Sequence, residues 1–318
     1  MSASVFISYS RRNRPFAERL YFDLNRAGLD VWLDLSDIPP GADFEQRILP
    51  AIAERSHLVL LASPDAADSE WVRREVSEAR SQHKTVIPLR LAGRSGTMPA
   101  EWERLNMIEG AALDYWGTVR RLARSLHAPR PQLLSLTELL NLQVGTTADA
   151  AAELTGAEEV TDAAGRSFVK LPVAPSAYAM TWLFAPLAAP LARPSALGVL
   201  FNFTSDYPGS RYKGALAHWA GQVVEPWMVM LEGPVNRQKH EYDVRTDHEA
   251  EWEDCIAAGT RLLEEHARGR DRLGYYLNCL VPLAFEVGLR TRMLAGPRRV
   301  FHFNARKGEY ELAADGWK

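Results

Sequence analysis

The sequence has little of what several protein classes require. Only two of its 318 residues are cysteines, Cys255 and Cys279, and they are not spaced as metal ligands. We therefore expect each to be a buried, reduced thiol rather than part of a disulfide framework or a zinc site. The longest apolar stretch, residues 179–191, is interrupted by Pro186 and Pro190 and is too short to span a bilayer.

An excess of charge is also lacking. The net charge is only −3, and residues 1–130 carry 18 basic and 17 acidic side chains. This balance argues against a general nucleic-acid binder, so we expect no DNA partner. The N-terminus enters a strand pattern directly, without the charged and apolar regions of a signal peptide. These features predict a soluble, cytoplasmic protein with no membrane partner.

The length and the apolar content predict two domains. A hydrophobic fraction of 47% over 318 residues is enough to build two cores. Pro129 and Pro131 interrupt the helical pattern that precedes them, because proline cannot continue a helix. We therefore predict domains at residues 1–127 and 128–318.

Strand and helix patterns alternate through the first domain. Short runs rich in apolar residues predict strands, and the segments between them have helical spacing. The predicted strands are residues 4–9, 31–35, 57–62 and 85–91. Gly28 is expected to end the first helix. This alternation predicts an α/β domain with a parallel sheet and right-handed crossovers.

The segment after the third predicted strand carries the candidate chemistry. Pro64 and the small residues after it are expected to turn the chain, and Ser69 to cap a helix. Trp71 and Glu75 are four residues apart, so they share one helix face. A carboxylate beside the carboxyl end of a parallel sheet lies where open α/β folds bind ligands. An ordinary surface carboxylate is the alternative interpretation of Glu75.

Several motifs of this domain resemble the TIR domain family. V-F-I-S-Y-S at the start resembles its first box, and Asp34–Gly41 falls where its loop after the second strand lies. The pattern S-x-W-x-x-x-E is similar to that of TIR domains that hydrolyse NAD. The resemblance implies a flavodoxin-like fold and cleavage of the nicotinamide–ribose bond, with Glu75 as the catalytic residue. The residues it implies for NAD binding are Tyr9, Ser10, Arg11, Trp32, Asp34, Ser69 and Trp71.

A single carboxylate is sufficient for this reaction. Nicotinamide leaves NAD as a neutral molecule, so no general acid is needed. The site has to stabilise an oxocarbenium-like ribose, and Glu75 can do so through its charge and its hydrogen bonds. The alternative for Trp32 is core packing. The alternative for Arg11 and Arg12 is that they are solvated surface charges. Many TIR domains are scaffolds without activity, so the fold alone does not give the function.

The second domain returns to alternating strands and helices after a less regular start. Residues 133–142 have a helical pattern, and the tract 145–165 is interpreted as a linker or a peripheral helix. Further strands are expected at 197–203, 226–231, 273–280, 300–303 and 310–312, and helices at 212–224, 248–268 and 282–288. The last two strands are expected to form a hairpin through Lys307 and Gly308. This half contains no phosphate loop, no G-x-G-x-x-G and no metal-ligand spacing.

The C-terminal part of this domain resembles SAVED domains over residues 273–312. Tyr276, the run Pro282–Gly288, V-F-H-F-N and Y-E-L carry the resemblance. It implies a Rossmann-like, CARF-related α/β domain, fused to an effector of an anti-phage (CBASS) system, that binds a cyclic oligonucleotide such as cyclic tri-adenylate. Such a ligand needs a few basic groups and stacking surfaces. The candidates are Phe203, Ser205, Tyr207, Arg211, Lys213, Arg237, Lys239, Arg306 and Lys307.

The two resemblances together predict an NAD hydrolase activated by cyclic oligoadenylate. No cofactor or metal is expected, since NAD is the substrate. The loop Ser36–Asp43 is placed to contact a neighbouring copy, and a head-to-tail contact that does not close gives a filament. One alternative is a STING domain that binds cyclic dinucleotides, because Gly274–Asn278 matches its G-Y-Y-x-N string. The others are a non-enzymatic TIR scaffold and a second domain that only mediates dimerisation or partner binding.

Overall fold

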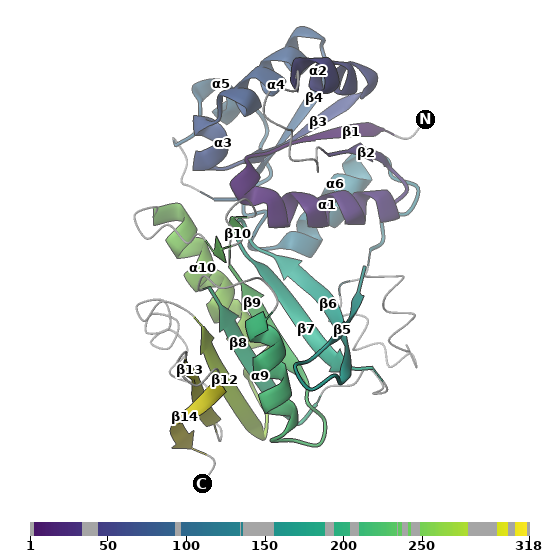
Figure 1. The fold of residues 1–318 in the computed structure, drawn as a ribbon. Helices are drawn as coiled ribbons and strands as arrows, with labels where there is room; N and C mark the ends of the chain where they lie inside the picture. The colour runs from purple at the N-terminus through teal and green to yellow at the C-terminus, as the bar shows by residue number, and fades with distance from the viewer. Residues whose placement is uncertain are drawn as a thin grey trace. The chain divides into compact units, whose positions relative to one another are not determined.

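A computed structural model of the chain describes residues 3–33, 44–92, 97–133, 135, 156–187, 194–203, 210–233, 235–236, 241–242, 249–278, 298–304 and 309–316. The chain divides into two compact units, which Figure 1 shows as a ribbon. Unit 1 comprises Met1–Leu134 together with Pro175–Tyr178. Unit 2 comprises Ser135–Ala174 and Ala179–Lys318.

Unit 1 is built on a four-stranded parallel sheet. Its strands are β1 (Ser4–Ser8), β2 (Asp30–Trp32), β3 (His57–Ala62) and β4 (Thr85–Arg90). They are ordered β2-β1-β3-β4, and every neighbouring pair is parallel. The predicted parallel α/β sheet is confirmed.

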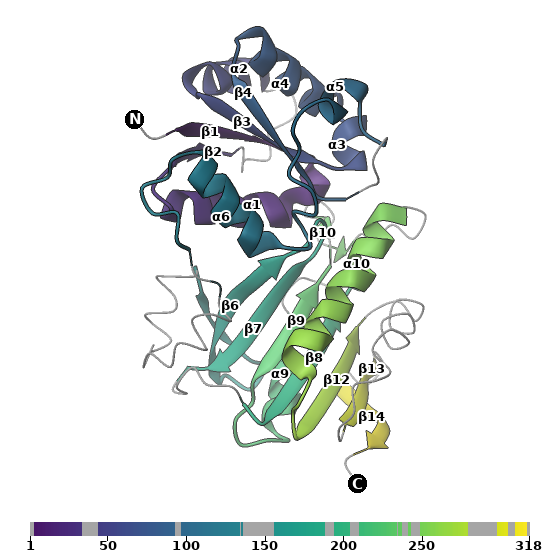
Figure 2. The same ribbon diagram turned by 180° about the vertical axis from the view of Figure 1, so that it is seen from behind.

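Helices cover both faces of this sheet. They are η1 (Arg11–Asn13), α1 (Arg14–Arg26), α2 (Phe44–Glu54), α3 (Pro64–Asp68), α4 (Glu70–Ser81), α5 (Ala100–Glu103) and α6 (Tyr115–Ser125). Helices α2 and α4 pack on one face, where their apolar side chains join Phe6, Leu58 and Leu60 in one core cluster. Helices α1 and α6 lie on the other face (Figure 2), with Phe16 and Tyr115 in edge-to-face contact. The sheet is therefore buried on both sides, which is why its strands read as continuous apolar runs.

Two local predictions in unit 1 have different outcomes. Gly28 follows α1 with φ +89°, a left-handed conformation that favours glycine, so the predicted end of this helix is confirmed. The prediction of a simple turn at Pro64 was wrong, because Pro64–Asp68 forms the short helix α3. The physical reason is local: the Ser63 hydroxyl accepts a hydrogen bond from the Ala66 amide, and proline is favoured at the first helical position.

Unit 2 is built on an eight-stranded mixed sheet. Its strands are β5 (Glu158–Thr161), β6 (Ser167–Pro175), β7 (Met180–Pro186), β8 (Ala196–Asn202), β9 (Met228–Glu232), β12 (Arg272–Asn278), β13 (Arg298–Asn304) and β14 (Glu309–Gly316). Their order is β14-β13-β12-β8-β9-β7-β6-β5. The centre, β13-β12-β8-β9, is parallel, whereas β14 and β7 are antiparallel to the strands they join. Strands β10 (Val235–Asn236) and β11 (Glu241–Tyr242) form a separate ribbon.

The beginning of unit 2 corrects the interpretation of its sequence. The tract 145–165 was expected to be a linker or a peripheral helix, but its residues Glu158–Thr161 form β5 and pair with β6. Strands β6 and β7 were not predicted at all. Pro172 lies inside β6, and proline within an apolar run argues against a strand because it cannot donate to the ladder. The other expected strands from residue 196 onward are confirmed, including the closing hairpin strands.

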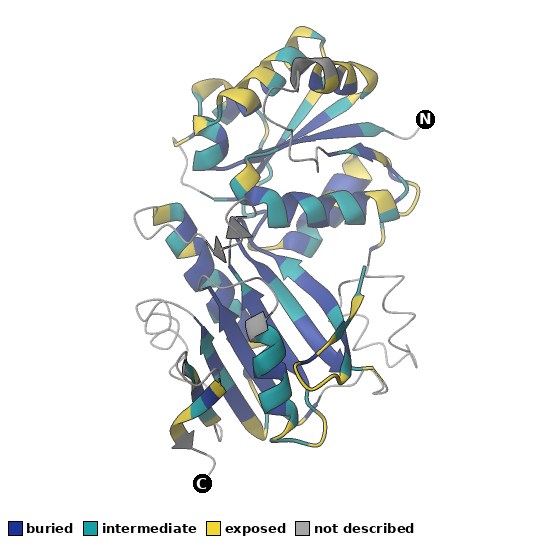
Figure 3. Cartoon of the chain, viewed as in Figure 1, coloured by how far each residue is buried: buried dark blue, intermediate teal, exposed yellow. Residues whose placement is uncertain are grey.

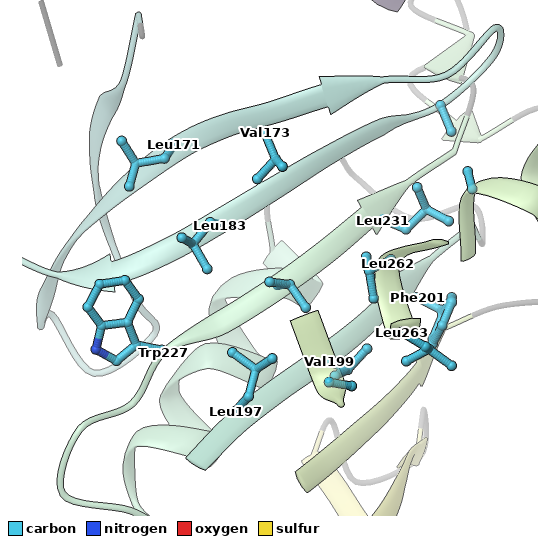
Figure 4. Close-up of a cluster of buried hydrophobic side chains, with 14 of the residues drawn as sticks. Leu171, Val173, Leu183, Leu197, Val199, Phe201, Trp227, Leu231, Leu262 and Leu263 are labelled. Atoms are coloured by element: carbon cyan, nitrogen blue, oxygen red, sulfur yellow. The ribbon is translucent and has the colours of Figure 1, made fainter. Parts of the chain in front are cut away.

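Two helices cover opposite faces of this sheet. Helix α9 (Ser210–Ala220) lies on one face, and α10 (Glu249–Leu262), extended by the π-helical turn η2 (Leu263–Ala267), on the other (Figures 1 and 2). Figure 4 shows Leu197, Val199 and Phe201 of β8 in one core cluster with Leu262 of α10 and Leu263 of η2. Alternate strand residues point the opposite way and pack with α9. Figure 3 shows that the central strands are buried along most of their length.

Some predicted features lie outside the described residues. These are Cys279, the helical pattern at 133–142 apart from Leu133 and Ser135, the helix at 282–288, and the turn through Lys307 and Gly308. Cys255 on α10 is buried, as expected. Among the residues that the structure describes, no helix is long and apolar enough to cross a membrane.

Candidate functional site

The strand order of unit 1 has a switch point at β1. From β1 the chain continues to β2 on one side, and β3 lies on the other side of β1. Ligands of open α/β sheets bind where the strand order reverses, beyond the carboxyl ends of the strands. In unit 1 this point lies after Ser8 of β1 and after Ala62 of β3.

Helix α4 brings a carboxylate to this point. Ser69 caps the helix, accepting a hydrogen bond from the Val72 amide at 3.4 Å. Val72 and Val76 are buried against the sheet, and the helical period leaves Glu75 half-buried beside them. The Ser8 hydroxyl donates to Glu75 Oε2 at 2.5 Å. The candidate carboxylate therefore lies at the carboxyl end of β1.

Trp71 lies one helical turn before Glu75 on the same face of α4. Its side chain is 45% exposed, an unusual position for the largest apolar side chain. The Arg74 guanidinium lies 5.1 Å from the centroid of the indole ring. An exposed indole beside a carboxylate offers a flat apolar wall for a ring-shaped ligand.

The three candidate residues after β1 directly follow Ser8, whose hydroxyl bonds this carboxylate. Tyr9 and Ser10 are half-buried, and Arg11 at the start of η1 is exposed. Arg12 is not simply a solvated charge, because its guanidinium lies 3.5 Å from the Asp65 carboxylate. An exposed arginine at the carboxyl edge of the sheet suits an anionic group of a ligand.

The candidates from the second strand are placed differently. Trp32 stacks on Phe6, with ring centroids 4.7 Å apart and an interplanar angle of 14°. It packs against the core cluster under α2 and α4, which matches the core-packing alternative. Asp34 and the loop Ser36–Asp43 lie outside the described residues.

Three polar residues of the site were missed by sequence reasoning: Ser8, Asn13 and Ser63. The Ser63 hydroxyl donates to Asn13 Oδ1 at 2.6 Å and thereby ties the segment after β3 to the segment after β1. Asn13 and Ser63 are both buried. For Ser8 a signal exists in the sequence, because a polar residue two positions after Phe6 occupies the buried face of a strand.

The predicted ligand residues of unit 2 are only partly described. Phe203 follows β8 and packs in the core, so its ring is not an exposed stacking surface. Its position is fixed by Gly233, where an added Cβ would lie 2.4 Å from Phe203 Cδ1. Lys213 is half-buried in α9, and of Arg211 only the backbone is described. The candidates outside the described residues are Ser205, Tyr207, Arg237, Lys239, Arg306 and Lys307.

Two asparagines end the adjacent parallel strands β8 and β12 of unit 2. Asn202 and Asn278 are the last residues of β8 and β12 and are register partners. Both are buried, and Asn278 Nδ2 donates to the Tyr310 hydroxyl at 2.7 Å. The buried Asn278 Oδ1 has no hydrogen-bond partner among the described residues. Because the strand order reverses between β8 and β12, these carboxamides occupy the switch point of this sheet.

An aromatic cluster lies beside this pair. The Tyr276 hydroxyl and His218 Nδ1 are 2.9 Å apart, and the Tyr276 ring stacks on Phe301. Burial raises the pKa of Tyr276 and lowers the pKa of His218. Both groups are therefore held in their neutral forms, as packing in a core requires. Among the described residues of the chain, no group of three His, Cys, Asp or Glu side chains is arranged to hold a metal ion.

Comparisons with known proteins concern unit 1. Residues 5–122 match the TIR domain family, TIR_2. A Brachypodium distachyon protein named "Probable 2' cyclic ADP-D-ribose synthase BdTIR" is 38% identical over 87 residues, which are 27% of this chain and 39% of that protein.

Two solved structures are also similar to part of the chain. The TIR domain of the Toll-related receptor TRR-2 from Hydra magnipapillata is 21% identical, with a TM-score of 0.33, and the match covers 39% of this chain and 99% of that one. The TIR domains of the activated Roq1 resistosome are 23% identical, with a TM-score of 0.25, and cover 28% and 57%. The family match, the parallel sheet and the order of the motifs agree. The N-terminal part of this chain is a TIR domain.

Proposed function

We propose that the TIR domain cleaves the nicotinamide–ribose bond of NAD, with Glu75 as the catalytic residue. The observation that carries this proposal is the position of Glu75. Its carboxylate is hydrogen-bonded to Ser8 at the switch point of a parallel sheet, one helical turn from an exposed indole. A surface carboxylate on an amphipathic helix would have no reason to accept a bond from a buried strand hydroxyl.

The geometry fits the chemistry that this bond cleavage needs. Positive charge develops on the ribose as the neutral nicotinamide leaves. A half-buried carboxylate at the rim offsets this charge more strongly than a solvated one, because the local dielectric constant is lower. Trp71 would pack against a ring of the substrate, and Arg11 would bind its phosphates. The name of the Brachypodium relative supports cleavage of NAD, and whether the product here is cyclised or linear is left to the experiment.

The test measures NAD consumption and products by the purified full chain, with a panel of cyclic di-, tri- and tetranucleotides. The Glu75→Gln variant keeps the shape of the side chain and removes its charge. We expect its kcat/KM to fall about 10²–10³-fold. Glu78→Gln is the matched control, since Glu78 lies on the same helix and bonds Gln82 on its surface, and should keep wild-type activity. Equal turnover in wild type and Glu75→Gln would refute the assignment.

We further propose that unit 2 is a SAVED-type sensor and that a cyclic oligonucleotide, such as cyclic tri-adenylate, activates the TIR domain. The buried carboxamides of Asn202 and Asn278 support this proposal, because amides at a switch point are suited to hydrogen-bond base edges. The string Gly274–Asn278, which favoured a STING domain, forms most of β12, and its Tyr276 is buried in a core cluster.

The sensor proposal has its own test. The melting temperature of the full chain is measured with each cyclic nucleotide, since a ligand that binds only the folded state raises it. We expect one ring size and base to raise it and to stimulate NAD consumption. We also propose that activation proceeds by self-association, so light scattering should increase with the same ligand. An unchanged melting temperature throughout the panel would favour a partner-binding or dimerisation module.

A further inference from the structure

The hydroxyl of Ser8 is held in an unusual place for a strand residue. Ser8 is the last residue of β1 and only 1% exposed. It shares the sheet face of Phe6, which packs under α4 with Val72 and Val76. A hydroxyl buried to this extent needs a hydrogen-bond partner. The partner is Glu75, 67 residues later in the chain.

The direction of this hydrogen bond follows from its two groups. Ser8 Oγ lies 2.5 Å from Glu75 Oε2. A carboxylate can only accept, so Ser8 must donate. A donor to the charged form stabilises that form, and it also fixes the direction of one carboxylate oxygen. Both effects serve a carboxylate that has to meet a developing cation.

From this geometry we infer that Ser8 is a positioning residue for the TIR reaction: it holds the Glu75 carboxylate oriented at the carboxyl end of β1. This inference rests on the proposed role of Glu75. Ser8 does not itself touch the substrate. It acts by removing the rotational freedom of the flexible Glu75 side chain before the substrate is bound. The entropic cost of ordering this side chain in the transition state is therefore smaller.

The expected consequence is a change in kcat rather than in KM. In Ser8→Ala the glutamate keeps its charge but loses the hydrogen bond from Ser8, so kcat should fall about 10–100-fold while KM changes less than about twofold. Ser8→Thr restores the hydroxyl and should recover at least part of the lost kcat. A purely structural role would not give this rescue, because the extra methyl group of threonine is a larger packing change than the removal of one oxygen.

The same strand supplies the matched control. Ser4 lies at the amino end of β1, on the same face, and its hydroxyl bonds Ser56. Ser4→Ala removes a hydroxyl from the same strand, but at the end away from Glu75. It should leave kcat unchanged. An equal fall of kcat in Ser4→Ala, or wild-type kcat in Ser8→Ala, would overturn the inference.

The two proposals fail in distinguishable ways. If wild type consumes NAD, Glu75→Gln does not, and Ser8→Ala matches wild type, the positioning role is refuted and the function stands. If wild type does not consume NAD with any ligand of the panel, the proposed function fails.

The Ser8–Glu75 interaction is then measured by thermal unfolding of Ser8→Ala, Glu75→Gln and the double variant. If the melting-temperature shifts of the two single variants do not sum to the shift of the double variant, this result supports an oriented carboxylate. Additive shifts refute it.

Discussion

Replacing Asp23 by asparagine is expected to destabilise unit 1 strongly, because Asp23 is the centre of a buried ionic network. Its side chain is 0% exposed on the sheet side of α1. Arg19 donates to both of its oxygens, at 2.7 and 2.8 Å, Arg26 lies 3.1 Å from Oδ1, and the Tyr115 hydroxyl donates at 2.7 Å. The network links α1 to α6.

The magnitude follows from what the substitution leaves behind. Asparagine nearly preserves the volume, so packing changes little. The Arg19 side chain is only 5% exposed, and its buried charge would lose the Asp23 carboxylate with which it pairs. Breaking one partner of a buried pair costs about 3–5 kcal/mol. The network also depends on protonation, since burial and the Asp23 charge raise the pKa of Tyr115 and keep its hydroxyl as a donor.

The assay has to measure unit 1 separately from unit 2. Native-state hydrogen exchange of the full chain, followed by mass spectrometry of peptides from α1 and β3, gives the free energy of opening of this unit. Glu54→Gln is the control, because the Glu54 side chain is 70% exposed and its pair with Arg55 contributes less than about 1 kcal/mol. An effect of Asp23→Asn as small as that of the control would refute the reasoning. Arg19→Met combined with Asp23→Leu removes both charges and should be less destabilising than Asp23→Asn.

Two further predictions concern unit 2. Gly274→Ala should lower the free energy of unfolding of unit 2, measured in urea, by about 1–3 kcal/mol, because the added Cβ would lie 2.5 Å from the buried Trp219 ring. Gly214→Ala in α9 meets no close atom and should stabilise the unit. Lowering the pH should also destabilise this unit. Burial lowers the pKa of His218 although Glu309 opposes the shift, so the unfolded chain takes up a proton first as the pH falls below about 6.5. Hydrogen exchange of α9 peptides at pH 7.5 and 5.5 should show this loss, and His218→Gln should reduce it; an unchanged loss in the variant would contradict the assignment to His218.

The sequence by itself determined the elements that have a local cause. Strand β3 and the start of helix α4 were predicted where the structure has them, because an apolar run and a capping residue are local signals. Ser69 as the cap and Glu75 on the face of Trp71 followed from the same local spacing. Strands β6 and β7 were missed because their prolines are a local signal against a strand, which neighbouring strands overrode.

Only the tertiary structure decided which distant residues meet. Ser8 and Glu75 come together because β1 lies beside β3 and α4 packs back on the face that carries Phe6. Asn202 and Asn278 became neighbours through the register of β8 with β12. Neither contact has a signature in the sequence, since strand order and register are set by the burial of whole faces rather than by any one segment. The sequence therefore pointed to the candidate carboxylate, and the fold brought to it the hydroxyl that bonds it.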